Sequence, residues 1–313
     1  MDNSIIKKCK LCPRKCLVDR TKGLGACLIG ENAIVAKSGL HFFEEPCISG
    51  TSGSGTIFFA GCNLKCIYCQ NYKISTFSEK NVDINNIIYD ENGLICKSSK
   101  VNSNDLANQM MLLQKLGANN INLVTGFSAV IQIIDAVKIA KEKGLTIPII
   151  YNSSGYESIE TIDMLDGIID VYLPDFKYYY NNLGKELSNV TDYFEVTNAA
   201  IKKMLSQVGN PIFDDKGIIK KGVIIRHLIL PNHIQNTKQV LKFIKNEYGS
   251  NTYVSIMTQY FPEYKAKEIS DINRKISKKE YTSIEQFVDK LGLKDGYMQD
   301  YVDEDETKYV PDF

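Results

Sequence analysis

The sequence has no excess charge of either sign, because 37 Lys and Arg residues balance 37 Asp and Glu residues. This balance gives no support for a nucleic acid or an anionic membrane as a partner. The chain also lacks an apolar run approaching the roughly 20 residues that cross a bilayer, and its first ten residues lack the apolar centre of a signal peptide. We therefore expect a cytoplasmic protein that binds neither membrane nor nucleic acid.

Cysteine is absent after Cys96, although the 313-residue chain contains nine cysteines. An odd number of cysteines cannot pair completely, and a disulfide scaffold usually belongs to a short secreted chain. In a reducing compartment, cysteines clustered in this way indicate ligation of a metal or an iron–sulfur cluster.

Apolar segments of strand length alternate with helical patterns from residue 56 onward. Strands are predicted at 56–60, 120–124, 147–151, 168–173, 222–230 and 252–257. Helices are predicted at 104–116, from 130 to 144, and at 157–165, 191–208 and 237–248, with a last helix that opens on the capping box of Ser277 and Glu280 and runs to Leu291. Six such units predict an α/β fold with a partial (β/α)6 barrel, and a doubly wound open sheet is the alternative. Both folds place ligands at the carboxyl ends of the strands.

Three regions follow from this pattern. Residues 1–50 are predicted to form a small, largely irregular cysteine-rich module, 51–270 the barrel, and 271–313 a helix with a solvated acidic tail. The polar segment 81–100 is expected to form an inserted loop or hairpin. The acidic residues of the tail are Asp295, Asp300, Asp303, Glu304, Asp305 and Glu306.

The motif GCNLKCIYCQN follows the first predicted strand and places Cys62, Cys66 and Cys69 in C-x3-C-x2-C spacing. Four-iron clusters usually take four thiolates. Three thiolates leave one iron open, so that it can bind the amino and carboxylate groups of a substrate. A zinc knuckle or free buried thiols are the alternatives, but zinc prefers C-x2-C pairs and closed four-coordination.

With Tyr68 before the third cysteine, this motif resembles that of the radical S-adenosylmethionine (SAM) superfamily. CKLCPRKC, the run from EEPCISG to CIYCQN, NINLVT and MTQYFP extend the likeness over roughly residues 9–265. They resemble uncharacterised Fe–S proteins homologous to pyruvate formate-lyase activating enzyme. The resemblance implies a [4Fe-4S] cluster on Cys62, Cys66 and Cys69 that reductively cleaves SAM to a 5′-deoxyadenosyl radical, which abstracts hydrogen from a substrate.

The same resemblance implies partners and further contacts. An oxidoreductase of this kind needs an external electron donor of the flavodoxin or ferredoxin type, and its substrate is a glycyl-radical enzyme, a peptide or a small molecule. Asn152 and Asp175 are expected to bind an ion or the SAM ribose, and Lys177 the SAM carboxylate. For Asp175 and Lys177 the alternative is a surface ion pair. The remaining residues expected to contact SAM are Tyr68, Asn71, Thr125, Ser128, Ser153 and Arg226.

Some of these positions have plainer alternatives. The acidic residue of the family's motif after the second strand is missing here, and Ser128 is equally suited to cap a helix. We expect His227 to be a hydrogen-bonded core histidine and Met257 to be a core residue, whereas Gln259 and Tyr260 are candidates for the pocket wall. Residues 50–55 are rich in glycine and are expected to let the backbone approach the cluster.

Four more cysteines, Cys9, Cys12, Cys16 and Cys27, lie in C-x2-C-x3-C-x10-C spacing. Four thiolates in so short a segment suffice for a closed metal site. Structural zinc is the preferred interpretation; a second [4Fe-4S] cluster that relays electrons is the other, and unligated thiols the third. Cys47 and Cys96 are interpreted as ordinary thiols. For the whole chain, a non-catalytic Fe–S electron carrier and a zinc-binding interaction module remain as alternative functions.

Overall fold

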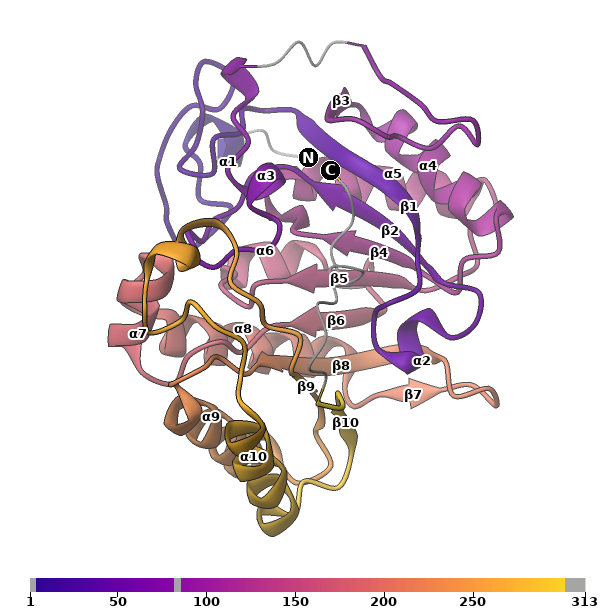
Figure 1. The fold of residues 1–313 in the computed structure, drawn as a ribbon. Coiled ribbons are helices and arrows are strands. Elements are labelled where there is room, and N and C mark those ends of the chain that lie inside the picture. Colours follow the sequence, from indigo (N-terminus) through magenta and orange to yellow (C-terminus); the bar gives the residue numbers. More distant parts are fainter. Residues whose placement is uncertain (1–3, 82–85, 302–312) are drawn as a thin grey trace.

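The computed structural model describes residues 4–81, 86–301 and 313. These residues form a sheet of ten strands in the order β10-β9-β8-β6-β5-β4-β2-β1-β3, with β7 (Ile212–Phe213) paired to β8 outside this path. In Figure 1 the strands are stacked from top to bottom of the view, and helices flank the sheet. The protein is therefore a mixed α/β fold.

The centre of the sheet is parallel and follows the chain. Its strands are β2 (Ser54–Phe59), β4 (Ile121–Val124), β5 (Ile149–Ser153), β6 (Val171–Pro174), β8 (Ile219–Leu228) and β9 (Tyr253–Met257). Each of them pairs in parallel with the next. These are the six predicted strands, with ends shifted by a few residues. Because the order does not reverse as a doubly wound sheet requires, it favours the partial barrel.

Helices connect these strands. They are α4 (Ser103–Lys115), α5 (Val130–Glu142), α6 (Ile159–Met164), α7 (Asn181–Ser188), α8 (Tyr193–Val208) and α9 (Ile234–Tyr248). The helix α4 shows how the sequence dictates them. Leu106, Met110 and Leu113 recur at helical spacing and are fully buried. The side chain of Asn102 caps the helix, so one apolar face and one cap fix its position on the sheet.

The N-terminal segment is more regular than predicted. Residues Ala33–His41 form the strand β1, which pairs antiparallel with β2, so the sheet begins inside the segment 1–50. The strand β3 (Ser99–Val101) pairs with β1. A bridge between Tyr89 and Ile95 closes a hairpin in the segment predicted as an insertion. Short helices α1 (Ser4–Lys7), α2 (Pro46–Ser49) and α3 (Tyr72–Ser75) complete this half.

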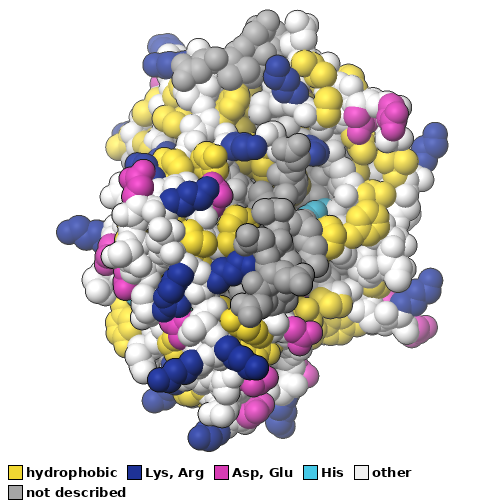
Figure 2. Space-filling model, in the orientation of Figure 1, with side chains coloured by type: hydrophobic (Ala, Val, Ile, Leu, Met, Phe, Trp, Pro, Cys, Tyr) yellow, Lys and Arg dark blue, Asp and Glu magenta, His cyan; other side chains and the backbone are white. Residues whose placement is uncertain are grey.

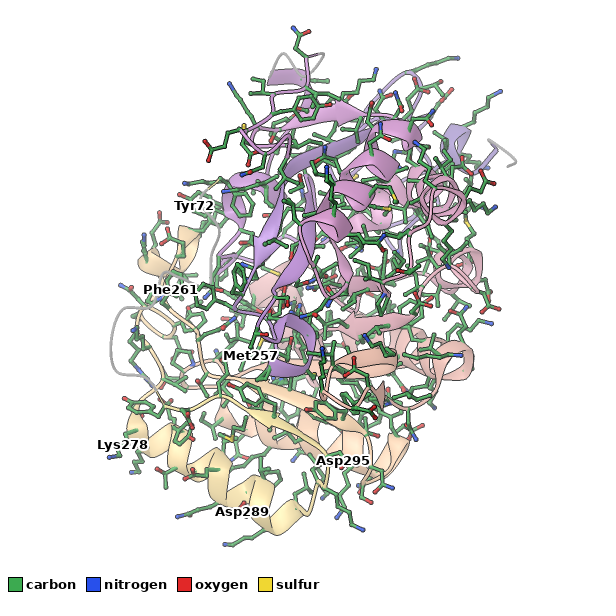
Figure 3. The ribbon with its side chains drawn as sticks, turned by 90° about the vertical axis from the view of Figure 1, so that its right-hand side faces the viewer. Tyr72, Met257, Phe261, Lys278, Asp289 and Asp295 are labelled. Atoms are coloured by element: carbon green, nitrogen blue, oxygen red, sulfur yellow. The ribbon has the colours of Figure 1, made fainter. Side chains whose placement is uncertain are left out.

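The C-terminal region also extends the sheet. The capping box predicted at Ser277 and Glu280 is present and opens α10 (Lys278–Leu291), which lies at the outer edge of the molecule in Figure 3. The strand β10 (Gly296–Met298) then pairs in parallel with β9, so the tail is not solvated from its start as predicted. The predicted acidic positions from 303 to 306 lie outside the described residues.

The glycine-rich segment 50–55 does not approach the cysteine loop. It enters β2 at the amino end of that strand, where a Cβ at Gly50 would lie 2.6 Å from a side-chain atom of Ile218. The cysteine triplet follows the opposite end. In the part of the chain that the structure describes, no helix has the length and apolarity to cross a membrane. Basic and acidic side chains are interspersed over the face seen in Figure 2.

Candidate active site

The cysteine loop leaves the carboxyl end of β2 through a tight turn at Gly61. Its φ of +80° favours glycine, and a Cβ there would lie 2.7 Å from the carbonyl oxygen of Cys27. After this turn, the Cys66 Sγ lies 2.9 Å from the Ser188 hydroxyl and the Cys69 Sγ lies 3.3 Å from the Ser75 hydroxyl. Hydroxyl groups therefore face two of the three sulfurs.

The three thiols lie close enough to affect one another. Burial raises the pKa of Cys62, and negative charge on Cys66 or Cys69 raises it further. Burial likewise raises the pKa of Cys66, to about 11, against the opposing effect of Lys177, and it raises the pKa of Cys69. Three ionised thiolates are therefore unfavourable here without a positively charged group to bind them. Within the described ranges, no three His, Cys, Asp or Glu side chains are arranged around a single metal ion.

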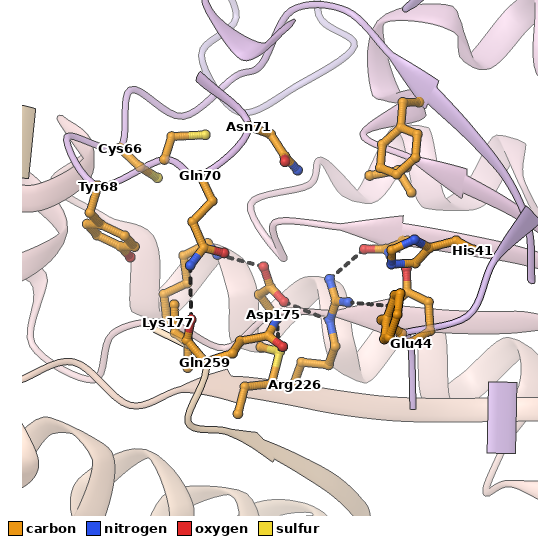
Figure 4. Close-up of a pocket in the computed structure, with 17 residues that line it drawn as sticks. His41, Glu44, Cys66, Tyr68, Gln70, Asn71, Asp175, Lys177, Arg226 and Gln259 are labelled. Carbon is orange, nitrogen blue, oxygen red and sulfur yellow. Dashed lines mark hydrogen bonds and ion pairs between the residues drawn. The ribbon is translucent and has the colours of Figure 1, made fainter. Parts of the chain in front are cut away.

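Cys66 and Cys69 open onto a cavity of about 200 Å³ at the carboxyl ends of the central strands. Figure 4 shows Asp175 and Arg226 at its centre, with Cys66 on one side and Glu44 on the other. Eight of the residues expected to bind the cluster or SAM line it: Cys66, Tyr68, Cys69, Asn71, Asn152, Asp175, Lys177 and Arg226. Side chains that lie far apart in the sequence thus share one wall, because parallel strands end at the same edge of a sheet.

Asp175 joins two cations at the floor of this cavity. Its carboxylate lies 2.6 Å from the Lys177 Nζ and accepts a hydrogen bond of 2.9 Å from the Arg226 Nε. Although burial disfavours its charge, Lys177 and Arg226 hold the pKa of Asp175 below its usual range. The side chains of this pair are 13% and 16% exposed, so it is not the surface ion pair considered as the alternative.

Arg226 extends the network across the cavity. Its Nη2 donates to the Asn152 Oδ1 at 2.6 Å, and its Nη1 lies 3.3 Å from the Glu44 Oε2. The Asn122 side chain donates to the other oxygen of Glu44 at 3.0 Å. The sequence analysis did not predict Glu44. The available signal was the pair of adjacent carboxylates that opens EEPC.

Tyr68 belongs to a buried chain of hydroxyl groups that leads to Cys66. Its hydroxyl lies 2.6 Å from that of Tyr178, which lies 2.7 Å from the Ser188 Oγ. Ser188 in turn contacts the Cys66 sulfur. Tyr178 and Ser188 were also missed, because no local pattern links them to the cysteine motif.

Of the residues expected to bind the cluster or SAM, four are not on the cavity wall: Cys62, Thr125, Ser128 and Ser153. Thr125 adopts a left-handed backbone conformation, with a φ of +62°. Ser128 is buried, and the residue before α5 is Ala129, so the alternative interpretation of Ser128 as a helix cap is wrong. The hydroxyl of Ser153 accepts a hydrogen bond from the Gly155 N–H at 3.2 Å.

Four further residues were predicted either to pack in the core or to line the pocket. His227 is a hydrogen-bonded core histidine as predicted, because its ring nitrogens lie 2.6 Å from the Phe176 carbonyl oxygen and 2.9 Å from the Thr237 hydroxyl. Met257 is not a core residue, since it lines the cavity together with Gln259. Tyr260 is buried, and its hydroxyl donates to the Ile272 carbonyl at 2.7 Å.

The four N-terminal cysteines lie near enough to affect one another's pKa, because Cys9 is influenced by Cys16 and Cys27, and Cys12 by Cys9 and Cys27. A Cβ at Gly25 would lie 3.3 Å from the Cys27 sulfur and 3.6 Å from the Cys16 sulfur. Burial raises the pKa of both Cys9 and Cys12. Of the two remaining cysteines, Cys47 is buried and Cys96 is exposed.

This N-terminal module is bonded to its surroundings. The Arg14 Nε donates to the Asn63 carbonyl of the cysteine loop at 2.6 Å. The hydroxyls of Ser158 and Thr161, at the start of α6, donate to the Leu11 carbonyl. The module therefore touches both the cysteine loop and the barrel.

Fold and site together define a class of α/β protein in which three closely spaced cysteines and a buried charged network meet at the edge of a parallel sheet. The chain is 33% identical over 292 residues to the uncharacterized protein MJ0674 of Methanocaldococcus jannaschii, and the match covers 93% of this chain and 77% of that protein. The chain belongs to the same family as this archaeal protein. No family model matches it.

Several solved structures resemble the chain weakly. SuiB of Streptococcus suis with its precursor peptide SuiA has a TM-score of 0.46 at 12% identity, over 76% of this chain and 46% of SuiB. HydG, a maturase of the [FeFe]-hydrogenase, has a TM-score of 0.48 at 12% identity, over 76% of this chain and 48% of HydG. Methylornithine synthase (PylB) has a TM-score of 0.48 at 15% identity, over 78% and 70%. The chain spans about half the length of SuiB and HydG, and likenesses at these scores do not establish a shared function.

Proposed function

We propose that this protein is a radical SAM enzyme in which Cys62, Cys66 and Cys69 hold a [4Fe-4S] cluster. The observation that carries the proposal is the opening of Cys66 and Cys69 onto the cavity that contains Asp175, Lys177 and Arg226. When bound, the cluster and SAM supply the radical chemistry that removes a hydrogen atom from a substrate. An Fe–S electron carrier needs no such cavity beside its cluster.

The residues present suit both groups. The thiols lie on one short loop, and hydroxyls of Ser188 and Ser75 contact two of the sulfurs, where hydrogen bonds tune a cluster. The SAM carboxylate is a suitable partner for Lys177, and its ribose hydroxyls or an ion for Asp175 and Asn152. Arg226 holds these last two side chains in place.

The N-terminal cysteines complete the proposal as a structural zinc site. They are not arranged around a single metal ion in the described structure, and zinc would bring the four thiolates together and fix their segment. Reduced thiols in such number favour a cytoplasmic enzyme. The electron donor is then a flavodoxin or ferredoxin. The likeness of the motifs to pyruvate formate-lyase activating enzyme suggests a glycyl-radical enzyme as substrate, and modification of a peptide or small molecule is the other possibility.

Anaerobic reconstitution tests the proposal. The protein is loaded with iron and sulfide, then mixed with SAM and dithionite, and 5′-deoxyadenosine is measured by chromatography. We expect release of this product by the wild type, loss of release in Cys66→Ala, and retention in Cys96→Ala, whose thiol is exposed and does not line the cavity. Cluster formation without 5′-deoxyadenosine would contradict the proposal and favour an electron carrier.

A further inference from the structure

A second cavity of about 200 Å³ adjoins the first. It lies between residues 42–46 and the strands β8, β9 and β10, and it shares Glu44, Arg226 and Met257 with the first cavity. Met257, the last residue of β9, lies near the middle of the molecule in Figure 3. Since one water occupies about 30 Å³ in the liquid, the space accommodates roughly half a dozen groups of that size. A molecule bound here would lie directly beside whatever occupies the first cavity.

Two buried polar groups in this second cavity have unmet hydrogen-bonding capacity. Glu45 is 6% exposed and Ser255 is 1% exposed, and both line the cavity. Among the residues that the structure describes, neither the Glu45 Oε2 nor the Ser255 Oγ has a hydrogen-bond partner of normal geometry, although the Ser255 hydroxyl lies near enough to Glu45 to lower the pKa of that carboxyl. An unsatisfied buried polar atom is destabilising by about 1–3 kcal/mol. An ionised Glu45 only accepts hydrogen bonds, and the Ser255 hydroxyl can accept as well as donate, so together they favour a ligand that donates hydrogen bonds.

The charged residues around the two cavities indicate the charge of that ligand. Of the described residues on their walls, Glu44, Glu45 and Asp175 are acidic, while Lys177 and Arg226 are basic. Both bases are engaged by Asp175, and Arg226 also contacts Glu44. Burial raises the pKa of Glu45, and Arg226 offsets this only in part. A cation that enters the cavity would replace the proton that Glu45 otherwise tends to retain.

The remaining walls are apolar and aromatic. Phe42 is 50% exposed and Phe43 is 43% exposed, and they line the cavity together with Pro46 and Tyr297. Aromatic faces of this kind pack against methylene groups and attract cations. The cavity thus combines a carboxylate at its wall with an aromatic lining.

We propose that this second cavity binds the protonated amine or guanidinium group of the substrate, with Glu45 and Ser255 as its acceptors and the aromatic residues around its alkyl chain. The assignment rests on the proposed function, which makes the adjoining cavity the place of the reaction. It narrows the substrate to a compound with a cationic side chain, whether a free amine or a Lys or Arg residue of a peptide.

Ligand-observed NMR titration tests this inference without reductant. The probes are 1-pentylamine, butylguanidine and the neutral 1-pentanol, added to reconstituted protein with SAM. We expect the two cations to bind at least about tenfold more tightly than pentanol, since hydrogen bonds to charged groups contribute about 1.5–3 kcal/mol. Acetyl-Gly-Lys-Gly-amide serves as a peptide probe: tighter binding than pentylamine identifies a peptide substrate, and weaker binding a free amine.

The variants Glu45→Gln and Ser255→Ala should weaken the binding of pentylamine, the former by tenfold or more. Glu142→Gln, at an exposed position of α5, is the matched control and should leave it unchanged. Equal binding of pentylamine and pentanol by the wild type would overturn the inference, and so would unchanged pentylamine binding in a folded Glu45→Gln protein. Because 5′-deoxyadenosine release is measured separately on the wild type, failure of the proposed function is distinguishable from failure of cation binding.

Discussion

Arg226 is the residue on which the buried charges of the site depend. It contacts Asp175, Asn152 and Glu44 at once, and its side chain is only 13% exposed. Removal of one partner from a buried ion pair leaves an uncompensated charge, which is strongly destabilising. A lysine has one ammonium group and cannot reproduce the fork of a guanidinium, so this position requires arginine.

We therefore expect Arg226→Met to lower the free energy of unfolding by roughly 3–5 kcal/mol, measured by chemical denaturation. Lys220→Met is the matched control, because Lys220 pairs with Asp214 at the surface and is 44% exposed. Exposed ion pairs contribute about 0–1 kcal/mol. Equal losses in the two variants would show that the Arg226 network does not stabilise the fold.

His227 makes a second prediction at the same scale. Burial lowers its pKa to about 4 from an ordinary value of 6.5. Between these two values the unfolded chain binds a proton that the folded protein rejects, so stability falls as the pH drops below 6.5. With about 1.4 kcal/mol for each unit of pKa, the loss between pH 7 and pH 5 is about 2 kcal/mol.

Denaturation of the wild type and of His227→Asn at both pH values measures this loss. The difference in unfolding free energy between the two proteins cancels titrations that they share. We expect the wild type to lose about 2 kcal/mol more than the variant on acidification. Parallel losses would mean that His227 is protonated in the folded protein, contrary to its buried hydrogen bonds.

At the scale of helices and strands, the sequence predicts what is encoded locally. The six parallel strands and α4 were found because each is a periodic apolar segment with a clear end. The strand β1 was missed, since its apolar run at residues 33–36 is followed by Lys37 and Ser38 and its pairing with β2 is a long-range property. Asp175 and Arg226 were found because they stand at strand ends or inside an apolar strand. Glu45 and Ser255 come together only in the folded chain, so no local sequence pattern predicts that they share a cavity.

The loop after β5 passes close to the backbone at the end of β6. Gly155 has a φ of +75°, and a Cβ there would lie 2.1 Å from the Asp175 carbonyl oxygen. At Gly144, where φ is +95°, a Cβ would meet nothing within 4 Å. The two glycines share a left-handed backbone and differ in the space around them, which makes them a matched pair.

Alanine at Gly144 should destabilise the protein by about 1 kcal/mol, because of its backbone conformation alone. Alanine at Gly155 should destabilise it by roughly 3 kcal/mol, because the new methyl group also displaces the backbone of Asp175. Thermal unfolding of both variants checks the difference. If their midpoints fell equally, close approach of the two loops would have no energetic consequence.

At the scale of the whole molecule, the two sets of cysteines lie on different loops that pack against each other. A Cβ at Gly61 would lie 2.7 Å from the Cys27 carbonyl oxygen, and Arg14 donates to the Asn63 carbonyl. Leu11 is held by α6. A metal at the N-terminal set would therefore stabilise the module that packs against the cysteine loop, without sharing ligands with the proposed cluster.

Metal analysis of two variants follows from this separation. After anaerobic purification, Cys12→Ala should lose zinc and retain iron, whereas Cys66→Ala should lose iron and retain zinc, as measured by mass spectrometry of the elements. Retention in each case is expected because each set has its own loop and its own hydrogen bonds to the barrel. If Cys12→Ala lost iron and kept an unchanged zinc content, the N-terminal cysteines would hold a second iron–sulfur cluster and not structural zinc.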